Sequence, residues 1–382
     1  MTQASRRFQV LSIFAAYGVA GIYWGAYFAA LPALQETSGL GDARFGLLVS
    51  SVTVGGILGM NLLGRHLHRA QAWAIPACLT LMGLSQLLLA AAGGPLGIAV
   101  ALLAIGAASG ALDISLNMRV ARIETDFGIR LFNRVHALFP FTMLVASASV
   151  GLLRGAGATP ATIFPSIVLL FLVAAAAERH AGRHQTAAEG IRTGGRLNWS
   201  PVLVALGVLA ALGALMEGGA GAWAAIYLER ELGAGPAFGG FAAAAITLGL
   251  TAGRLAAHHL EDRMRDMAIL RSFALLSLPA FAVLALVPHP AAALCAFFLA
   301  GFGTGPIEPA IFRSVTRRHP EAVRGTALAR ATALAYTGYL LSAPALGRSI
   351  EAAGWPATWG LLAVLGIAAS LLSLRVPPAP RP

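Results

Sequence analysis

The sequence predicts an all-α polytopic membrane protein with twelve transmembrane helices in two six-helix bundles related by pseudo-twofold symmetry. The first observation is composition, because 57% of the 382 residues are hydrophobic and only 11% are charged. A soluble domain carries about a quarter charged residues, so a lipid bilayer is needed to cover the surface of this chain. The second observation is a regular alternation of apolar runs with arginine clusters, and the third is an internal repeat.

Apolar runs long enough to cross a membrane recur along the whole chain. A spanning helix needs about 20 mostly apolar residues. Runs of this kind lie at residues 8–34, 44–64, 72–92, 95–118, 133–153, 160–178, 200–228, 237–259, 267–287, 290–312, 325–347 and 355–374. The first run follows Arg6 and Arg7 and is too long for the core of a signal peptide, so it is expected to remain as a span.

The basic residues are divided unequally between the two sides of the predicted spans. The chain has no lysine, and all 27 basic residues are arginines. With a cytoplasmic N-terminus, 22 arginines fall on that side, 4 fall on the other and Arg330 lies within a span. The positive-inside rule therefore predicts that both termini are cytoplasmic, in a bacterial inner membrane. The same distribution explains the net charge of +11 without a nucleic-acid partner.

A hydrophilic segment divides the chain into two halves that repeat each other. The predicted domains are an N-terminal bundle at residues 1–178, a cytoplasmic linker at 179–199 and a C-terminal bundle at 200–382. Three phrases recur in the same order, at offsets of 189, 195 and 196 residues: Gly64-Arg65 with Gly253-Arg254, Gly106 to Asn117 with Gly301 to Glu308, and Arg134 to Leu138 with Arg330 to Leu334. Parallel repeats with a site between the halves are typical of secondary transporters.

Twelve spans in a six-plus-six duplication with a central cytoplasmic loop resemble the major facilitator superfamily over the whole chain. Three stretches resemble its fucose-permease-like bacterial branch: Asp113 to Asn117 followed by Arg134 to Phe139, Glu217 to Trp223 with Tyr227, and Thr337 to Pro344. The loop after the second span departs from the family pattern, because residues 64–69 lack its aspartate. The fifth span has Pro140 without the glycines that follow in drug/proton antiporters.

The resemblance implies that the first, fourth, seventh and tenth spans line a central cavity. The acids within the predicted spans are Asp113, Glu217 and Glu308, in the fourth, seventh and tenth. An ionised carboxylate facing lipid costs several kcal/mol, so these side chains are expected to face the interior and to exchange protons. The alternative is a structural acid bonded to a neighbouring helix or to Arg330. Asp113 lies about 9 Å along the helix from Arg119, so it could instead belong to an inner gate.

Candidate substrate-binding residues are polar or aromatic side chains of the expected cavity helices and of span five. Asn117 shares the helix face of Asp113, and its amide suits the hydroxyl groups of a sugar, although interhelical bonding is equally compatible. His136 could relay protons or be structural. The aromatic candidates are Tyr23, Trp24, Tyr27, Trp223 and Tyr227. Their faces suit sugar rings, but the same residues also form interfacial belts.

The arginines near the expected cytoplasmic ends of spans are candidate gating residues. They are Arg65, Arg69, Arg119, Arg122, Arg134 and Arg330, of which the last could also pair with Glu308 or extend back to the cytoplasm. The Gly106/Gly110 and Gly301/Gly305 stripes are expected to form close helix contacts. Cys78 and Cys295 have no metal or redox spacing, and no cofactor, metal site or enzyme activity is predicted.

The favoured function is a monomeric, proton-coupled secondary transporter that moves a small polar solute, such as a sugar, by alternating access. The alternative is a proton-antiport exporter of drug-like or amphiphilic compounds, which the aromatic residues permit and the fifth span disfavours. A membrane-embedded enzyme or sensor would need a clustered polar active site or an added soluble domain, and the sequence shows neither.

Overall fold

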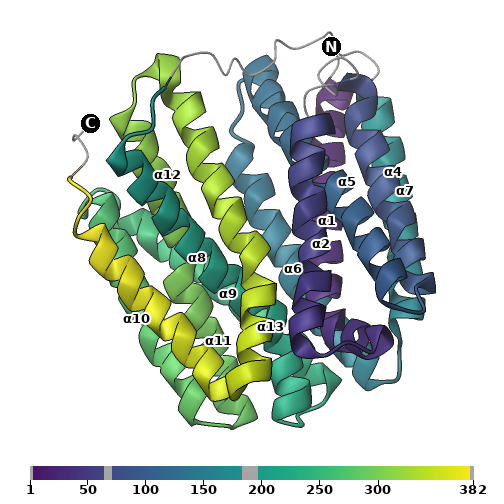
Figure 1. The fold of residues 1–382 in the computed structure, drawn as a ribbon. Helices are drawn as coiled ribbons and strands as arrows, with labels where there is room; N and C mark the ends of the chain where they lie inside the picture. The colour runs from purple at the N-terminus through teal and green to yellow at the C-terminus, as the bar shows by residue number, and fades with distance from the viewer. Residues whose placement is uncertain (1–2, 64–70, 183–196, 379–382) are drawn as a thin grey trace. The chain divides into compact units, whose positions relative to one another are not determined.

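The computed structural model describes residues 3–63, 71–182 and 197–378, and its regular structure in these ranges is entirely helical (Figure 1). The chain divides into two compact units. The first comprises Met1–Leu40 and Ser51–Gly190, and the second comprises Gly41–Ser50 and Ile191–Pro382.

The first unit is built from six helical segments that pack around α1 and α5. They are α1 (Gln3–Ser38), α2 (Asp42–Leu58, apart from its first residues) continued by η1 (Gly59–Leu63), α4 (Gln71–Ala91), α5 (Pro95–Phe127), α6 (Phe132–Gly155) and α7 (Pro160–Ala181). The helix α1 packs against α5, α6 and α7, and α4 packs against α5 and α7.

The second unit repeats this arrangement with α8 and α13 at its centre. Its helices are α8 (Pro201–Ile226) continued by η3 (Tyr227–Glu231), α9 (Pro236–Leu260), α10 (Asp266–Leu286), α11 (Pro290–Thr304), α12 (Ile307–Arg318) and α13 (Glu321–Ser373). The helix α13 packs against α8 and α10, and α11 packs against α9 and α10.

Within the described residues, the twelve predicted spans correspond to these helices, although several limits differ by a residue or more and Gly305 and Pro306 interrupt the tenth span. Among the described residues, eleven helical stretches are long and apolar enough to cross a membrane, and the last of them, Glu321–Ser373, contains two predicted spans. Gly354 interrupts it with φ 78° and ψ 176°, a conformation open essentially only to glycine. The eleventh and twelfth spans are therefore separate helices that meet at this glycine.

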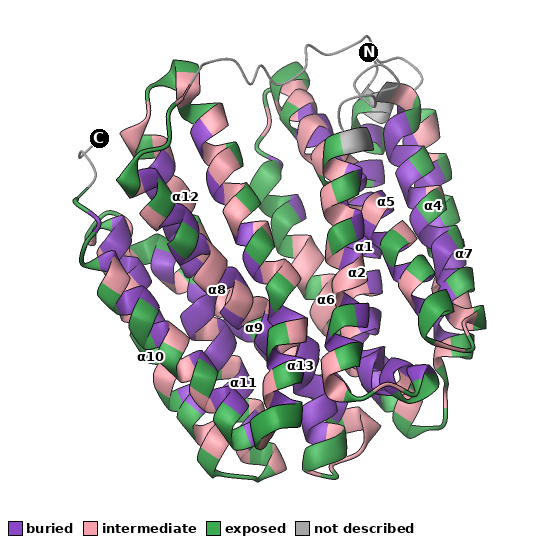
Figure 2. Ribbon diagram, in the orientation of Figure 1, coloured by how far each residue is buried: buried purple, intermediate pink, exposed green. Residues whose placement is uncertain are grey.

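The outer faces of both units expose large apolar side chains, as expected for helices in lipid (Figure 2). Leu96, Leu169 and Val173 of the first unit are 78%, 66% and 60% exposed, and Leu286 of the second unit is 77% exposed. Water would not solvate so many exposed leucines and valines in a stable monomer. The exposure pattern therefore agrees with the bilayer surroundings that composition predicts.

Several helices extend beyond the predicted span limits, and α5 and α7 are the two that bear on the candidate residues. The prediction ended the fourth span at residue 118, but α5 continues to Phe127 and ends at Gly128, whose φ of 62° closes the helix. The prediction placed Glu178 at the edge of the linker, but α7 includes it and buries it to 2% exposure. Loss of hydropathy marks the edge of a membrane and does not by itself end a helix, so both boundaries were placed too early.

The glycine stripes form close helix contacts, as predicted. In each unit, the stripe lies against backbone carbonyls of the second helix of that half. A Cβ built on Gly106 or Gly110 would lie 2.0 or 2.4 Å from the carbonyl oxygen of Val52 or Gly56. The matching distances for Gly301 and Gly305 are 2.3 and 2.8 Å, to the carbonyl oxygens of Ile246 and Leu250.

Adding a methyl group at Gly106 should therefore destabilise the first unit. Gly106→Ala is expected to lower the free energy of unfolding by about 1–3 kcal/mol, because α2 and α5 must separate to relieve the overlap. Gly360→Ala is the matched control, because a Cβ there meets no atom within 4 Å. The control should be neutral or stabilising by up to about 1 kcal/mol. Unfolding in mixed detergent micelles measures both, and equal stabilities would contradict the close contact.

Candidate functional site

The first unit brings together three side chains from three helices around Asp113. Tyr17 of α1 donates a hydrogen bond of 2.9 Å from its hydroxyl to Asn117 Oδ1. The amide of Asn117 in turn donates to Asp113 Oδ1 at 3.2 Å, one helical turn away on α5. Asp113 itself is exposed within this unit, whereas Tyr17 is only 4% exposed. The arrangement presents a carboxylate whose orientation is fixed by an amide and a buried phenol.

His136 of α6 completes this cluster. Its ring lies 5.2 Å from the ring of Tyr17 and interacts electrostatically with Asp113. Its Nδ1 lies 3.0 Å from the carbonyl oxygen of Phe132, so Nδ1 carries the proton and Nε2 is the acceptor in the neutral ring. Phe132 also stacks on the imidazole at 4.0 Å. A carboxylate and an imidazole held together in this way can exchange protons with a solute or with water.

The second unit places Glu217 of α8 in contact with a cation and a phenol. Arg254 Nη2 lies 3.4 Å from each carboxylate oxygen of Glu217, and Tyr339 of α13 donates its hydroxyl at 3.3 Å. Gly218 allows this approach, since a Cβ there would lie 2.8 Å from the ring of Tyr339. Glu217 is thus held by side chains from two other helices.

The break between α11 and α12 explains how Arg254 is oriented. Pro309 has no N–H, so the carbonyl of Gly305 lacks its usual helical partner four residues on. Arg254 Nε donates to that carbonyl at 3.1 Å. Pro306 and Pro309 flank Glu308 at this break, and the break supplies an acceptor that positions the guanidinium beside Glu217.

Glu308 belongs to the same cluster. It lies in the first turn of α12 and interacts electrostatically with Glu217, Arg254 and Tyr339. Its Oε1 atom is buried without a hydrogen-bond partner among the described residues. Arg254 thus supplies the one positive charge of a cluster that contains two carboxylates, and one added proton makes the cluster electrically neutral. Protonation of Glu308 would remove the cost of burying its charge.

Equivalent helices of the two halves build these clusters. The first, fourth and fifth helices carry Tyr17, Asp113 and His136 in one unit. The corresponding helices α8, α12 and α13 carry Glu217, Glu308 and Tyr339 in the other. The predicted acids thus occupy equivalent helices of the two units, Asp113 at an exposed position and Glu217 and Glu308 at partly buried ones, and their role in proton coupling stays a prediction.

Three members of these clusters are not among the candidate residues that the sequence suggests. Sequence analysis assigns Arg254 to the arginines of the cytoplasmic side, although it lies well inside the predicted span 237–259. This position within a span could have identified it as a candidate. Tyr17 stood out only as one of several aromatic residues in the first span. Tyr339 lay in the stretch that resembles the fucose-permease-like branch, but nothing in its spacing distinguished it.

The aromatic candidates of α1 lie inside the first unit. Tyr23 and Tyr27 are 0% and 1% exposed, and their hydroxyl groups have no hydrogen-bond partner among the described residues. Their rings stack at 5.9 Å, and Tyr23 also contacts Phe164 of α7. Trp24 is partly exposed and packs edge-on against both tyrosines. Of the three, Trp24 alone presents ring surface outside the unit.

The aromatic candidates of the second unit have partners for their polar atoms. Trp223 is 1% exposed, and its indole nitrogen donates to the carbonyl of Ala343 at 3.1 Å. Tyr227 is 2% exposed and donates to the carbonyl of Leu284 at 2.9 Å. Its ring lies against Trp355 and Trp359. Substrate contact by Trp223 or Tyr227 stays a prediction, and it would need a conformation that uncovers them.

Among the candidate gating arginines, Arg119 is buried within the first unit. It is 5% exposed, donates to Gln9 Oε1 at 3.0 Å and pairs with Glu178 at 3.9 Å. Arg119 thus joins α1, α5 and α7. Arg122 pairs with Asp126 of its own helix at 3.5 Å, and Arg134 is exposed at the start of α6. Glu124 accepts the backbone N–H of Phe132 at 2.8 Å and so caps α6.

Arg330 does not form the predicted pair with Glu308 in the second unit. Its guanidinium lies over the ring of Trp199, 4.7 Å from the centroid, in a cation–π arrangement. Its Nη1 atom is buried without a hydrogen-bond partner among the described residues, so a pair with Glu308 is not formed. The candidates Arg65 and Arg69, and most of the predicted linker, lie outside the described residues.

Within the described ranges, no three His, Cys, Asp or Glu side chains are grouped as metal ligands would be. Cys78 is buried and Cys295 is exposed, and neither forms a disulfide.

Comparison with known proteins places this geometry in a family context. Residues 206–382 match the family model described as Major Facilitator Superfamily. An uncharacterized MFS-type transporter of Yersinia pestis is 26% identical over 369 residues, which cover 94% of this chain and 93% of the relative. A bacterial homolog of the human lysosomal transporter Spinster has a similar structure, with a TM-score of 0.78, 14% identity and 98% coverage of both chains. The D-xylose-proton symporter has a TM-score of 0.70, 13% identity and coverage of 97% and 98%. The chain is therefore a polytopic membrane protein with the major facilitator fold, and its second half carries the sequence pattern of that superfamily.

Proposed function

We propose that this protein is a proton-coupled secondary transporter that moves a small polar solute by alternating access. The observation that carries the proposal is the cluster of the second unit, in which Glu217 and Glu308 share Arg254. An intramembrane ionisable group is costly and is usually retained for function. This cluster changes between neutral and negative with a single proton, which is the property that proton coupling requires.

A sugar-like solute fits the proposal best. Asp113, Asn117 and His136 offer acceptors and donors on one surface of the first unit, and Trp24 offers an aromatic face. Such groups recognise the hydroxyls and the ring of a sugar. The D-xylose-proton symporter, which has a similar fold, is a proton-coupled sugar transporter by its own description. The three stretches that resemble the fucose-permease-like branch favour the same class of substrate.

The proposed setting is a bacterial inner membrane with both termini in the cytoplasm and a monomer as the working unit. The positive-inside rule supports this membrane orientation, with both termini in the cytoplasm. Gating by the arginines at that side, including Arg119, Arg122 and Arg134, remains part of the proposal.

Uptake by reconstituted vesicles tests the function. Vesicles with an imposed pH gradient are offered a panel of radiolabelled pentoses, hexoses and nucleosides, with protein-free vesicles as the background. We expect gradient-dependent accumulation of at least one sugar, and loss of the accompanying proton uptake in Asp113→Asn or Glu217→Gln. Unchanged proton uptake in both variants would contradict the assignment of the acids. Movement only against the direction of proton flow would favour an exporter.

A further inference from the structure

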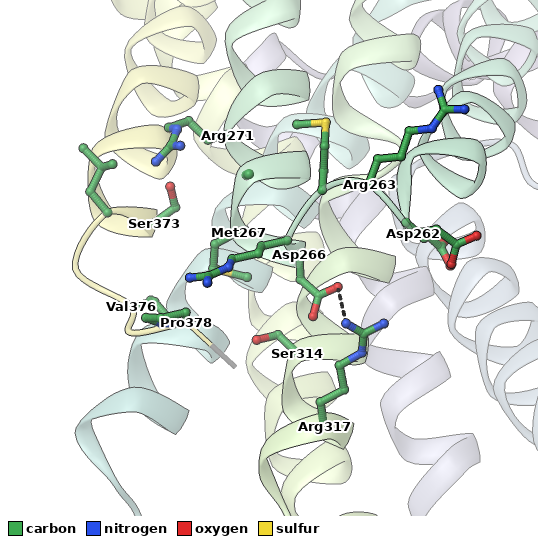
Figure 3. Close-up of a pocket in the computed structure, with 15 residues that line it drawn as sticks. Asp262, Arg263, Asp266, Met267, Arg271, Ser314, Arg317, Ser373, Val376 and Pro378 are labelled. Atoms are coloured by element: carbon green, nitrogen blue, oxygen red, sulfur yellow. Dashed lines mark ion pairs between the residues drawn. The ribbon is translucent and has the colours of Figure 1, made fainter. Parts of the chain in front are cut away.

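A pocket of about 620 Å³ lies in the second unit where α9 is followed by α10 (Figure 3). Its walls are the connection at residues 261–265, the first turns of α10, part of α12 and the segment that follows α13. Arg318 donates a hydrogen bond to the carbonyl of Pro377, and Val376 is 6% exposed. These contacts hold the last described residues in place as one wall of the pocket.

We propose that this pocket binds the phosphate group of an anionic phospholipid whose acyl chains lie along α10 and α13. The site is separate from the Glu217–Arg254–Glu308 cluster and does not depend on the transported solute. Two features on the protein carry the proposal: a surplus of arginine charge in the pocket, and an apolar stripe that leads away from it.

Most of the acidic charge in the pocket is already neutralised by arginines of α12. Asp266, which is 5% exposed, accepts from Arg313 at 2.8 Å. It also forms an ion pair with Arg317 at 3.8 Å (Figure 3). Arg313 also pairs with Glu261. These contacts fix the acids as part of the wall, so they do not compete for the remaining cations.

Three arginines that line the pocket have no acidic partner among the described residues. They are Arg263, Arg265 and Arg271, and Asp262 is the one lining acid outside the Arg313 network. The surplus is therefore two positive charges. Guanidinium groups bind phosphate oxygens in pairs of charge-assisted hydrogen bonds, and a phosphodiester anion would satisfy this surplus.

The pocket also has an apolar side that a free anion would not use. Met264, Met267, Leu374 and Val376 line it together with the arginines. From Leu374, which is 61% exposed, the outer face of α13 continues through Leu371, Ile367 and Val364, at 59%, 43% and 59% exposed. Their spacing places them on one helix face. On the neighbouring α10, Leu275 lies one turn from Arg271 and is 44% exposed.

The arginine surplus and the adjoining apolar stripe together favour a phospholipid over a soluble phosphate. An acyl chain can lie against the exposed apolar side chains of α13 and α10 beside the pocket, whereas inorganic phosphate makes only the ionic contacts. Basic pockets between membrane helices at the cytoplasmic side are known to hold anionic headgroups. The positive-inside rule predicts that side for this end of the unit.

Native mass spectrometry of the full-length protein in detergent tests the proposal, with phosphatidylglycerol and phosphatidylcholine of the same acyl chains as probes. We expect tighter binding of phosphatidylglycerol, and about tenfold or greater weakening in the Arg265→Gln/Arg271→Gln variant, since both guanidinium groups lose their charged hydrogen bonds to the phosphate. Arg44→Gln/Arg348→Gln removes the same charge from exposed positions of the second unit outside the pocket and is the matched control.

A charge-retaining variant separates binding from folding. Arg265→Lys/Arg271→Lys should keep phosphatidylglycerol affinity within a few-fold of the unmodified protein. Equal affinity for the two lipids would overturn the proposal, and so would equal weakening in the pocket variant and in the Arg44/Arg348 control. Full displacement of phosphatidylglycerol by millimolar inorganic phosphate would assign the pocket to a free anion and would overturn the lipid.

Discussion

Glu308→Gln is expected to abolish gradient-driven accumulation while leaving exchange of the solute intact. Glu217 and Arg254 remain paired in this variant, so the cluster stays neutral and resembles the protonated state. It can then carry solute in both directions but can no longer add or release a proton. With one proton per solute, a gradient of one pH unit supports about tenfold accumulation, and the variant should fall to about onefold.

Proteoliposomes provide both readouts for this prediction. Accumulation under a pH gradient measures coupling, and counterflow of labelled against unlabelled solute measures exchange. Glu321→Gln removes an exposed acid from the start of α13 and is the matched control. Retained accumulation in Glu308→Gln would exclude this carboxyl group as the coupling site. Loss of both accumulation and counterflow would show instead that Glu308 is needed for substrate binding or for folding.

Arg254→Gln provides an independent check on the same cluster. It leaves Glu217 and Glu308 close together without a cation, so like charges oppose each other unless one is protonated. The double variant Arg254→Gln/Glu217→Gln removes this opposition and should recover stability relative to the single variant. Because the Arg254 side chain is 45% exposed, solvent screening reduces the effect on unfolding, and transport is the more sensitive measurement.

The sequence predicts the helices and the interior acids because both depend on local or compositional signals. Twenty-residue apolar runs predict the spans, and carboxylates within them predict interior positions. The glycine contacts of Gly106 and Gly301 follow from spacing, because a helix face of small residues permits close approach. These predictions needed no knowledge of which helices are neighbours.

The hydrogen-bond and ion-pair partners of these side chains could not be predicted, because they depend on packing between helices that are distant in the chain. Arg254 meets Glu217 only because α8 and α9 pack together and because Pro309 leaves the Gly305 carbonyl free. Arg119 was expected at a membrane edge but is enclosed by α1 and α7. Trp223 and Tyr227 are residue types that are common in sugar sites, but their N–H and O–H groups donate to backbone carbonyls of neighbouring helices.

The buried Arg119–Glu178 pair should have the largest effect on stability in the first unit. The two side chains are 4% and 2% exposed, so Glu178→Ala removes a buried carboxylate that pairs with Arg119 inside the unit. The expected loss in the free energy of unfolding is about 3–5 kcal/mol. Unfolding in mixed detergent micelles measures it. Asp126→Ala is the control on the neighbouring turn of α5, because it breaks a pair whose acid is 49% exposed and should cost about 0.5 kcal/mol or less.

Replacing both partners distinguishes an unpaired charge from lost packing. Arg119→Met/Glu178→Leu removes the pair and fills the space with apolar groups, which is often neutral for buried ion pairs. This variant should therefore be more stable than Glu178→Ala, although Gln9 loses the hydrogen bond that it receives from Arg119. If the double variant is as unstable as Glu178→Ala, the side-chain network itself, and not the isolated charge, holds α1, α5 and α7 together. If Glu178→Ala matches Asp126→Ala, water reaches Arg119 and the pair is not a buried one.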